Sequence, residues 1–125
     1  MEKEKIWNYY PPDKIIKVNL QESIFEKIFV DCLSEVPHGS KLVIFGADAW
    51  GRKFFARLIN EPLYRLCGWV DTRNFGYPVL PVDINLLNFT DYIIVTFPSK
   101  ETCIQVENAL KNIGIDPKKI LRLHL

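Results

Sequence analysis

Apolar residues along this chain follow two patterns, and the first of them predicts strands. Residues 42–45 and 92–97 form near-continuous apolar runs, as expected for parallel strands that are covered on both faces. Shorter apolar segments predict three further strands. The predicted strands, in chain order, are 42–45, 66–70, 79–80, 92–97 and 120–123.

The second pattern, with apolar residues three or four positions apart, predicts helices between the strands. These helices are 50–60, a short one near 82–87, and 100–113. Ser99 is the expected N-cap of the last helix, which Gly114 and Pro117 would end.

A further helix is predicted before the first strand. Asn19 is its expected N-cap, and Glu22 at the third helical position completes a pattern like a capping box. Pro11 and Pro12 are expected to exclude helix from the aromatic segment that precedes it. The apolar stripe of this helix consists of Ile24, Phe25, Ile28, Phe29, Cys32, Leu33 and Val36.

A glycine turn follows the first predicted strand. Gly46 would allow the tight turn, and Gly51 would let the next helix pack closely on the sheet. The backbone N–H groups at the start of this helix would form an anion-binding site, at Ala47, Ala49 and the residues beside them. The pattern is close to the dinucleotide-binding motif G-x-G-x-x-G, except that Asp48 occupies the second glycine position.

The alternation of strands and helices, together with this turn, predicts a Rossmann-like α/β fold. We expect a doubly wound sheet of five parallel strands in the order 3-2-1-4-5, numbered along the chain. Residues 41–125 would form this nucleotide-binding domain. Residues 1–40 would add the aromatic segment and the extra helix within one globular unit, where the helix would cover part of the sheet or contact a second copy.

Asp48 leaves three interpretations open. At about 4 Å and an effective dielectric constant of about 20, its carboxylate would repel a phosphate by roughly 4 kcal/mol before screening, which opposes dinucleotide binding in the usual pose. Alternatively, Asp48 would cap the helix and occupy the anion site itself. In the third interpretation, it would hold a differently placed ligand, for example through a sugar hydroxyl.

Two cations follow Asp48 on the first helical turn, where they oppose the helix dipole. Arg52 and Lys53 would therefore contact an anionic ligand, or Arg52 would pair with Asp48 or Asp71. Trp50 is expected to pack in the protein more readily than to stack on a ligand.

Two more segments would bring polar side chains to the same end of the sheet. Asp71 ends the second predicted strand, where dinucleotide-binding folds place the acid that binds ribose hydroxyls, and Arg73 would assist it. Alternatively, Asp71 only forms the turn. Phe97 and Ser99 follow the fourth predicted strand, across from Gly46, in the crevice where ligands of open α/β sheets bind.

Composition and charge indicate which classes of function are not expected for this protein. The chain has 125 residues, of which 48% are hydrophobic and 25% charged, as expected for one globular domain. The net charge is +1 and the cations are dispersed, so no surface for nucleic acid or an anionic membrane is predicted. No apolar run approaches the roughly 18 to 20 residues of a membrane span, and no secretion signal is recognised, which predicts a cytoplasmic protein.

Residue types that carry catalysis or bind metals are sparse. Cys32, Cys67 and Cys103 follow no metal-binding spacing and lie in apolar segments, which favours buried thiols over reactive ones. His38 and His124 lie away from the predicted crevice. No metal site or catalytic set is predicted, and an enzymatic activity is therefore not favoured.

From residue 42 onward, the chain resembles the Rossmann-like nucleotide- or sugar-nucleotide-binding modules of bacterial surface-polysaccharide enzymes. These include amino-terminal domains of sugar acetyltransferases and of nucleotide-sugar dehydratases. The segments that carry the resemblance are 46–52, 68–71, 76–79, 91–96 and 108–114. The resemblance implies a ligand held by the turn at 46–51 and by Asp71.

Three functional hypotheses follow. The first is a non-catalytic module that binds a nucleotide, either NAD(P) or a nucleotide sugar, and works as a homo-oligomer or with an enzyme of polysaccharide biosynthesis. The second is a protein-interaction or scaffold domain whose ligand site has degenerated, as Asp48 would indicate. The third, a small NAD(P)-dependent or nucleotide-sugar-modifying enzyme, is less favoured because no general base converges on the turn.

Overall fold

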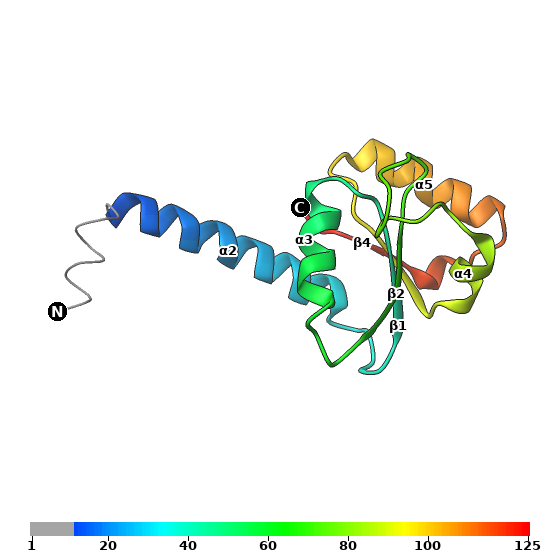
Figure 1. Ribbon diagram of the computed structural model, residues 1–125, viewed down its shortest axis with the longest axis horizontal. Coiled ribbons are helices and arrows are strands. Elements are labelled where there is room, and N and C mark those ends of the chain that lie inside the picture. Colours follow the sequence, from blue (N-terminus) through cyan, green and yellow to red (C-terminus); the bar gives the residue numbers. More distant parts are fainter. Residues whose placement is uncertain (1–11) are drawn as a thin grey trace.

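The computed structural model describes residues 12–125, with side chains from Glu22 onward (Figure 1). Within these residues, the chain alternates between strands and helices after a long first helix, α2. The elements are α2 (Pro12–Leu33), β1 (Lys41–Phe45), α3 (Ala49–Leu58), β2 (Arg65–Val70), α4 (Ile84–Phe89), β3 (Tyr92–Val95), α5 (Lys100–Asn112), a 3-10 turn (Pro117–Lys119) and β4 (Ile120–Arg122).

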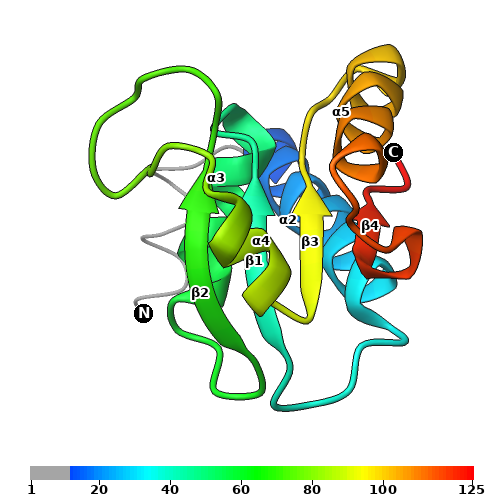
Figure 2. The same cartoon turned by 90° about the vertical axis from the view of Figure 1, so that its right-hand side faces the viewer.

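The strands form one parallel sheet in the order β2-β1-β3-β4, with helices on both faces (Figure 2). Four of the predicted strands are confirmed, as are the predicted helices at α3, α4 and α5, with ends shifted by one or two residues. This mixed α/β architecture is compatible with a Rossmann-like fold.

The prediction of five strands in the order 3-2-1-4-5 is wrong, because residues 79–80 do not form a strand. Only Leu80 pairs with the sheet, through one isolated parallel bridge to Val70. Pro78 and Pro81 flank this pair of residues. Proline has no N–H to continue a ladder, so the pairing stops after a single bridge.

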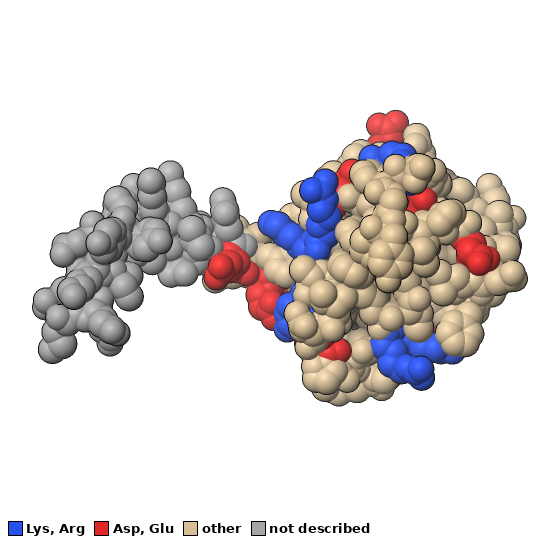
Figure 3. Space-filling view, in the orientation of Figure 1, with Lys and Arg blue, Asp and Glu red and all other residues tan. Residues whose placement is uncertain are grey.

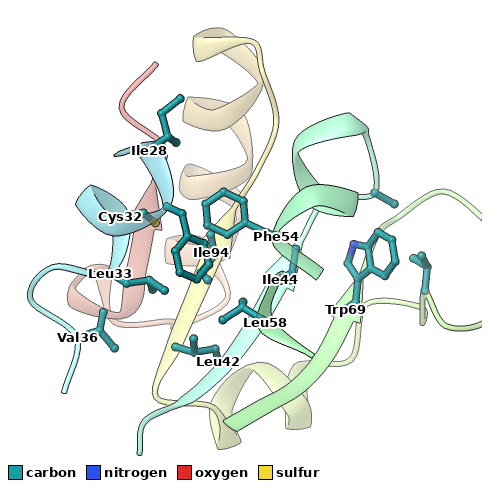
Figure 4. Close-up of a cluster of buried hydrophobic side chains, with 13 residues drawn as sticks. Ile28, Cys32, Leu33, Val36, Leu42, Ile44, Phe54, Leu58, Trp69 and Ile94 are labelled. Atoms are coloured by element: carbon teal, nitrogen blue, oxygen red, sulfur yellow. The ribbon is translucent and has the colours of Figure 1, made fainter. Parts of the chain in front are cut away.

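Alternate residues of β1 face opposite sides of the sheet, and each side has its own hydrophobic core. Leu42 and Ile44 pack with the buried side chains of α2 and α3 (Figure 4). Val43 and Phe45 pack with those of α4 and α5. Because both faces are covered, β1 lacks the polar alternation of a half-exposed strand.

The helix α2 begins earlier than the sequence predicts. It starts at Pro12, so the expectation that this proline excludes helix is wrong, and Asn19 lies inside the helix instead of capping it. Proline is tolerated at the first helical position, where its missing N–H would have no helical partner. Pro11 and the aromatic segment before it lie outside the described residues.

The carboxyl-terminal part of α2 covers one face of the sheet, while its amino-terminal part extends beyond the body of the molecule (Figure 1). An aromatic cluster joins it to α3. The ring centroid of Phe54 lies 5.7 Å from that of Phe25 and 5.4 Å from that of Phe29. Trp50 packs at 6.1 Å from Phe25, which fits its expected packing role.

Along the sequence, the cations are dispersed among the acids. On the face shown in Figure 3, Lys and Arg side chains alternate with Asp and Glu among larger uncharged areas. Within residues 12–125, no helix is long and apolar enough to cross a membrane.

Candidate functional site

The glycine turn after β1 is shaped by two close backbone contacts. Gly46 has a φ of +128°, and a Cβ there would lie 2.6 Å from Thr96 Oγ1. A Cβ on Gly51 would lie only 2.0 Å from the carbonyl oxygen of Gly46. That carbonyl also accepts hydrogen bonds from Trp69 Nε1 at 2.7 Å and Thr96 Oγ1 at 3.2 Å. The predicted roles of both glycines in the turn and in helix packing are confirmed.

Asp48 occupies the N-cap position of α3, but its side chain does not cap the helix. Its backbone is extended and its carbonyl accepts the first helical hydrogen bond from the N–H of Arg52, at 3.0 Å. No N–H of the first turn bonds to its carboxylate, so the predicted internal cap is wrong. The carboxylate instead pairs with Arg73, whose Nη2 lies 3.1 Å from Asp48 Oδ1.

Asp71 joins the loop after β1 to the loop after β2. Its carboxylate is fully buried. The N–H of Ala47 donates to Oδ2 at 2.8 Å, and Arg73 donates to the same carboxylate from its backbone N–H, Nε and Nη2 at 2.8, 3.0 and 2.9 Å. The turn-forming role expected of Asp71 is therefore present. A ligand in this region would meet Arg73 before Asp71.

The two partners hold each other in their charged forms. Burial alone would raise the pKa of Asp71, but hydrogen bonds from Arg73 and from the N–H of Ala47 outweigh it and hold the pKa below its ordinary value. The hydrogen bond to Asp71 in turn raises the pKa of Arg73. Both groups stay ionised at neutral pH.

This ion pair predicts a loss of stability in acid. Because the pKa of Asp71 is lower in the folded protein than its unfolded value of about 3.9, its contribution is complete above that value and is lost as the pH falls through the folded-state pKa. We therefore expect Asp71→Asn to be less stable than the original protein at neutral pH, with the difference narrowing below about pH 4. Urea unfolding at stepped pH would measure it.

The comparison with Asp71→Asn isolates this carboxylate. Glu61 and Glu107, whose pKa values are lowered by hydrogen bonds from Arg57 and Arg122, titrate in both proteins and do not affect the difference. A gap in unfolding free energy that stays constant down to about pH 2 would contradict the prediction.

A cavity of about 510 Å³ lies beside this ion pair, at the carboxyl ends of the strands. Asp48 and Arg73 border it from the loops after β1 and β2, and Phe97 and Ser99 border it from the loop after β3. The structure therefore brings together four of the residues that the sequence predicts for a ligand site. The complete lining is Phe45, Asp48, Thr72, Arg73, Phe97, Pro98, Ser99, Thr102, Gln105, Val106 and Ala109.

The other predicted site residues do not line this cavity. The backbone segment at Gly46, Ala47, Ala49 and Gly51 forms the turn itself. Trp50 packs against α2. Arg52 is exposed and makes no ion pair with any described residue, so its predicted pairing with Asp48 or Asp71 is wrong. Arg73 takes that place.

One wall of the cavity was not predicted. It comes from α5, where Thr102, Gln105, Val106 and Ala109 line the space. Gln105, Val106 and Ala109 follow Thr102 by three, four and seven positions, which is the spacing of one helical face. Ser99, whose Oγ accepts the N–H of Thr102 at 3.4 Å, begins this helix as predicted.

Arg73 lies at the mouth of the site and is half exposed. Its guanidinium carbon lies 4.9 Å from the ring centroid of Phe75 and 5.8 Å from that of Phe97. Its Nε and Nη2 bond to the carboxylates, whereas Nη1 has no hydrogen-bond partner among the described residues. The buried carboxylate of Asp71 thus orients a guanidinium whose Nη1 keeps donor capacity.

The cysteines are buried to different degrees. Burial raises the pKa of Cys32 to about 12 and also raises the pKa of Cys103, so neither thiol is activated. Cys67 is partly buried. Among the described side chains, no group of three or more His, Cys, Asp or Glu residues could hold a metal ion.

No protein-family model, curated protein or solved structure matches this chain. The fold and the site therefore define its class on their own. It is an α/β protein whose parallel four-stranded sheet carries a cavity at the carboxyl ends of its strands.

Proposed function

We propose that the protein is a non-catalytic module that binds a nucleotide or a nucleotide sugar. The observation that supports this is the position of the cavity. The chain leaves β1 toward α3 on one face of the sheet and leaves β3 toward α5 on the other (Figure 2). Residues of both connections, Asp48 and Ser99 among them, line the cavity. Open α/β sheets bind their ligands between two such connections.

The size and lining of the cavity support a small-molecule ligand. Ligand cavities are commonly about 300–1,000 Å³ and mostly apolar, with a few polar groups that fix the orientation. Here Phe45, Phe97 and Val106 form apolar walls, and Asp48 and Arg73 contribute the charged groups. The lining favours binding over catalysis because the single carboxylate and the single guanidinium pair with each other, and general acid–base chemistry needs a group that is available to the substrate.

A ligand screen with a blocked cavity tests the proposal. We expect calorimetric titration with NAD⁺, NADP⁺, UDP-glucose and CDP-glucose to detect binding of at least one. Ala109→Trp should weaken that binding by about tenfold or more, because the indole would fill part of the space lined by this residue.

Asn108→Trp is the matched control, since Asn108 is exposed on the same helix and does not line the cavity. Equal affinities in the two variants would place the ligand elsewhere. If none of the four compounds binds, the proposal fails.

A protein-interaction module is the second candidate, supported by apolar side chains on the connection between β2 and α4. Tyr77 is 92% exposed, and Phe75, Leu80 and Val82 are also exposed. Neighbouring exposed apolar side chains of this kind mark contact surfaces in many proteins. If the ligand screen detects no binding, a protein-interaction module becomes the favoured function.

A further inference from the structure

Two opposite charges share one wall of the cavity. The carboxylate of Asp48 and the guanidinium of Arg73 lie 3.1 Å apart and both line the space. An anionic group that approaches Arg73 also approaches the Asp48 carboxylate, and a cationic group that approaches Asp48 meets the guanidinium. The wall therefore disfavours a full charge of either sign.

Hydrogen-bond acceptors are in excess beside the cavity, because two carboxylates share one guanidinium. Arg73 also serves Asp71, whose buried carboxylate takes three of its hydrogen bonds. One guanidinium thus faces two carboxylates, and the outer one, on Asp48, keeps lone pairs that are exposed to the cavity. A phosphate would have to approach a carboxylate whose only cation is already shared.

The wall of the cavity that α5 forms carries neutral polar residues. Thr102 and Gln105 line the cavity from α5, and neither the hydroxyl of Thr102 nor the amide of Gln105 has a hydrogen-bond partner among the described residues. Both groups can donate and accept. A ligand group that fits this wall and Asp48 together must therefore also donate and accept, without carrying a charge.

Hydroxyl groups have these properties. We infer that the cavity takes the uncharged, polyhydroxylated part of the ligand, the glycosyl group of a nucleotide sugar, with Asp48 accepting a hydrogen bond from one of its hydroxyls and the phosphates remaining outside. In this arrangement Arg73 and Asp71 are positioning residues that hold the Asp48 carboxylate, and the rings of Phe45 and Phe97 pack against the apolar face of the sugar. The inference rests on the proposed function and gives the discordant aspartate of the glycine turn a role.

The test compares a nucleotide sugar with the nucleotide that lacks the sugar. Calorimetric titrations would use UDP-glucose against UDP and CDP-glucose against CDP, with the full chain. We expect at least one sugar-bearing compound to bind tenfold or more tightly than its diphosphate. Asp48→Asn, which replaces the carboxylate with a weaker, uncharged acceptor, should reduce this preference and leave diphosphate affinity unchanged or higher, and Asp31→Asn, which changes an exposed acid on α2, should alter neither.

A second variant keeps the inference testable if Asp48→Asn does not fold. Thr102→Val removes one hydroxyl at nearly constant volume and should weaken binding of the sugar-bearing compound severalfold, with no effect on the diphosphate. Diphosphates that bind as tightly as their sugar derivatives would overturn the inference while the proposed function stands. So would an Asp48→Asn protein that binds both members of a pair more tightly by the same factor. Absence of binding by UDP-glucose, UDP, CDP-glucose and CDP would overturn the inference, and the proposed function would fail as well if NAD⁺ and NADP⁺ also do not bind.

Discussion

Replacing Gly51 with alanine is expected to destabilise the protein by about 3 kcal/mol or more. The new Cβ would lie 2.0 Å from the carbonyl oxygen of Gly46 and 3.0 Å from Thr96 Oγ1. The carbonyl cannot move away easily because Trp69 Nε1 and Thr96 Oγ1 both donate to it. The helix α3 would have to separate from β1, which would break the packing that holds it to the sheet.

Urea unfolding of Gly51→Ala measures this effect, and Gly68→Ala is its matched control. A Cβ on Gly68 would also make a close contact, 2.8 Å from Leu86 Cδ2, but that atom is the end of a flexible side chain. We expect this control to lose no more than about 1 kcal/mol, because Leu86 can change rotamer. Similar losses in the two variants would show that the carbonyl contact does not fix the helix.

Truncation of Phe54 to alanine should reduce the free energy of unfolding by about 3–5 kcal/mol. This ring is completely buried between α2 and α3 (Figure 4). It contacts Phe25 and Phe29 of α2, so its removal leaves a cavity at the contact between the two helices. The effect should therefore reach α2 as well as α3.

Thermal or urea unfolding of Phe54→Ala would be compared with Phe89→Ala. Phe89 is 58% exposed, and its ring mainly covers the ammonium of Lys41, which lies 3.8 Å from the ring centroid. We expect this control to lose less than about 1 kcal/mol. Hydrogen exchange across residues 25–33 would show whether α2 is weakened. Full protection there in Phe54→Ala would contradict the joint packing of the two helices.

Much of the fold can be predicted because the strands and helices carry strong local patterns. The strand at 42–45 is apolar throughout, and the helix at 100–113 has both an apolar face and a capping serine. The strand expected at 79–80 failed because two apolar residues say little about ladder length, which here is limited by the flanking prolines. The start of α2 differs from the prediction because Pro12 is a helix breaker only in a helix interior, and proline suits the first helical turn, where it lies here.

The site was harder to predict, since its chemistry depends on contacts between distant segments. The pattern around Asp48 is that of an N-cap, and its backbone does occupy that position. The local pattern does not indicate Arg73, which lies in the loop after β2 and pairs with the Asp48 carboxylate in place of the helix N–H groups. The sequence does not indicate the α5 wall at Thr102 and Gln105, because polar residues on a helix ordinarily form the solvent side of an amphipathic pattern.

The single bridge at Leu80 has a consequence for how this protein can associate with other chains. The N–H of Leu80 donates to the sheet at Trp69 O, the N–H of Val79 donates to Gly76 O, and Pro81 has none. Residues 79–81 therefore offer an incoming strand no backbone donor, which protects the carboxyl end of the β2 edge from edge-to-edge aggregation. A partner that binds there must use side chains such as Tyr77, whereas assembly by strand addition would have to proceed from β4 or from the part of β2 that precedes Trp69.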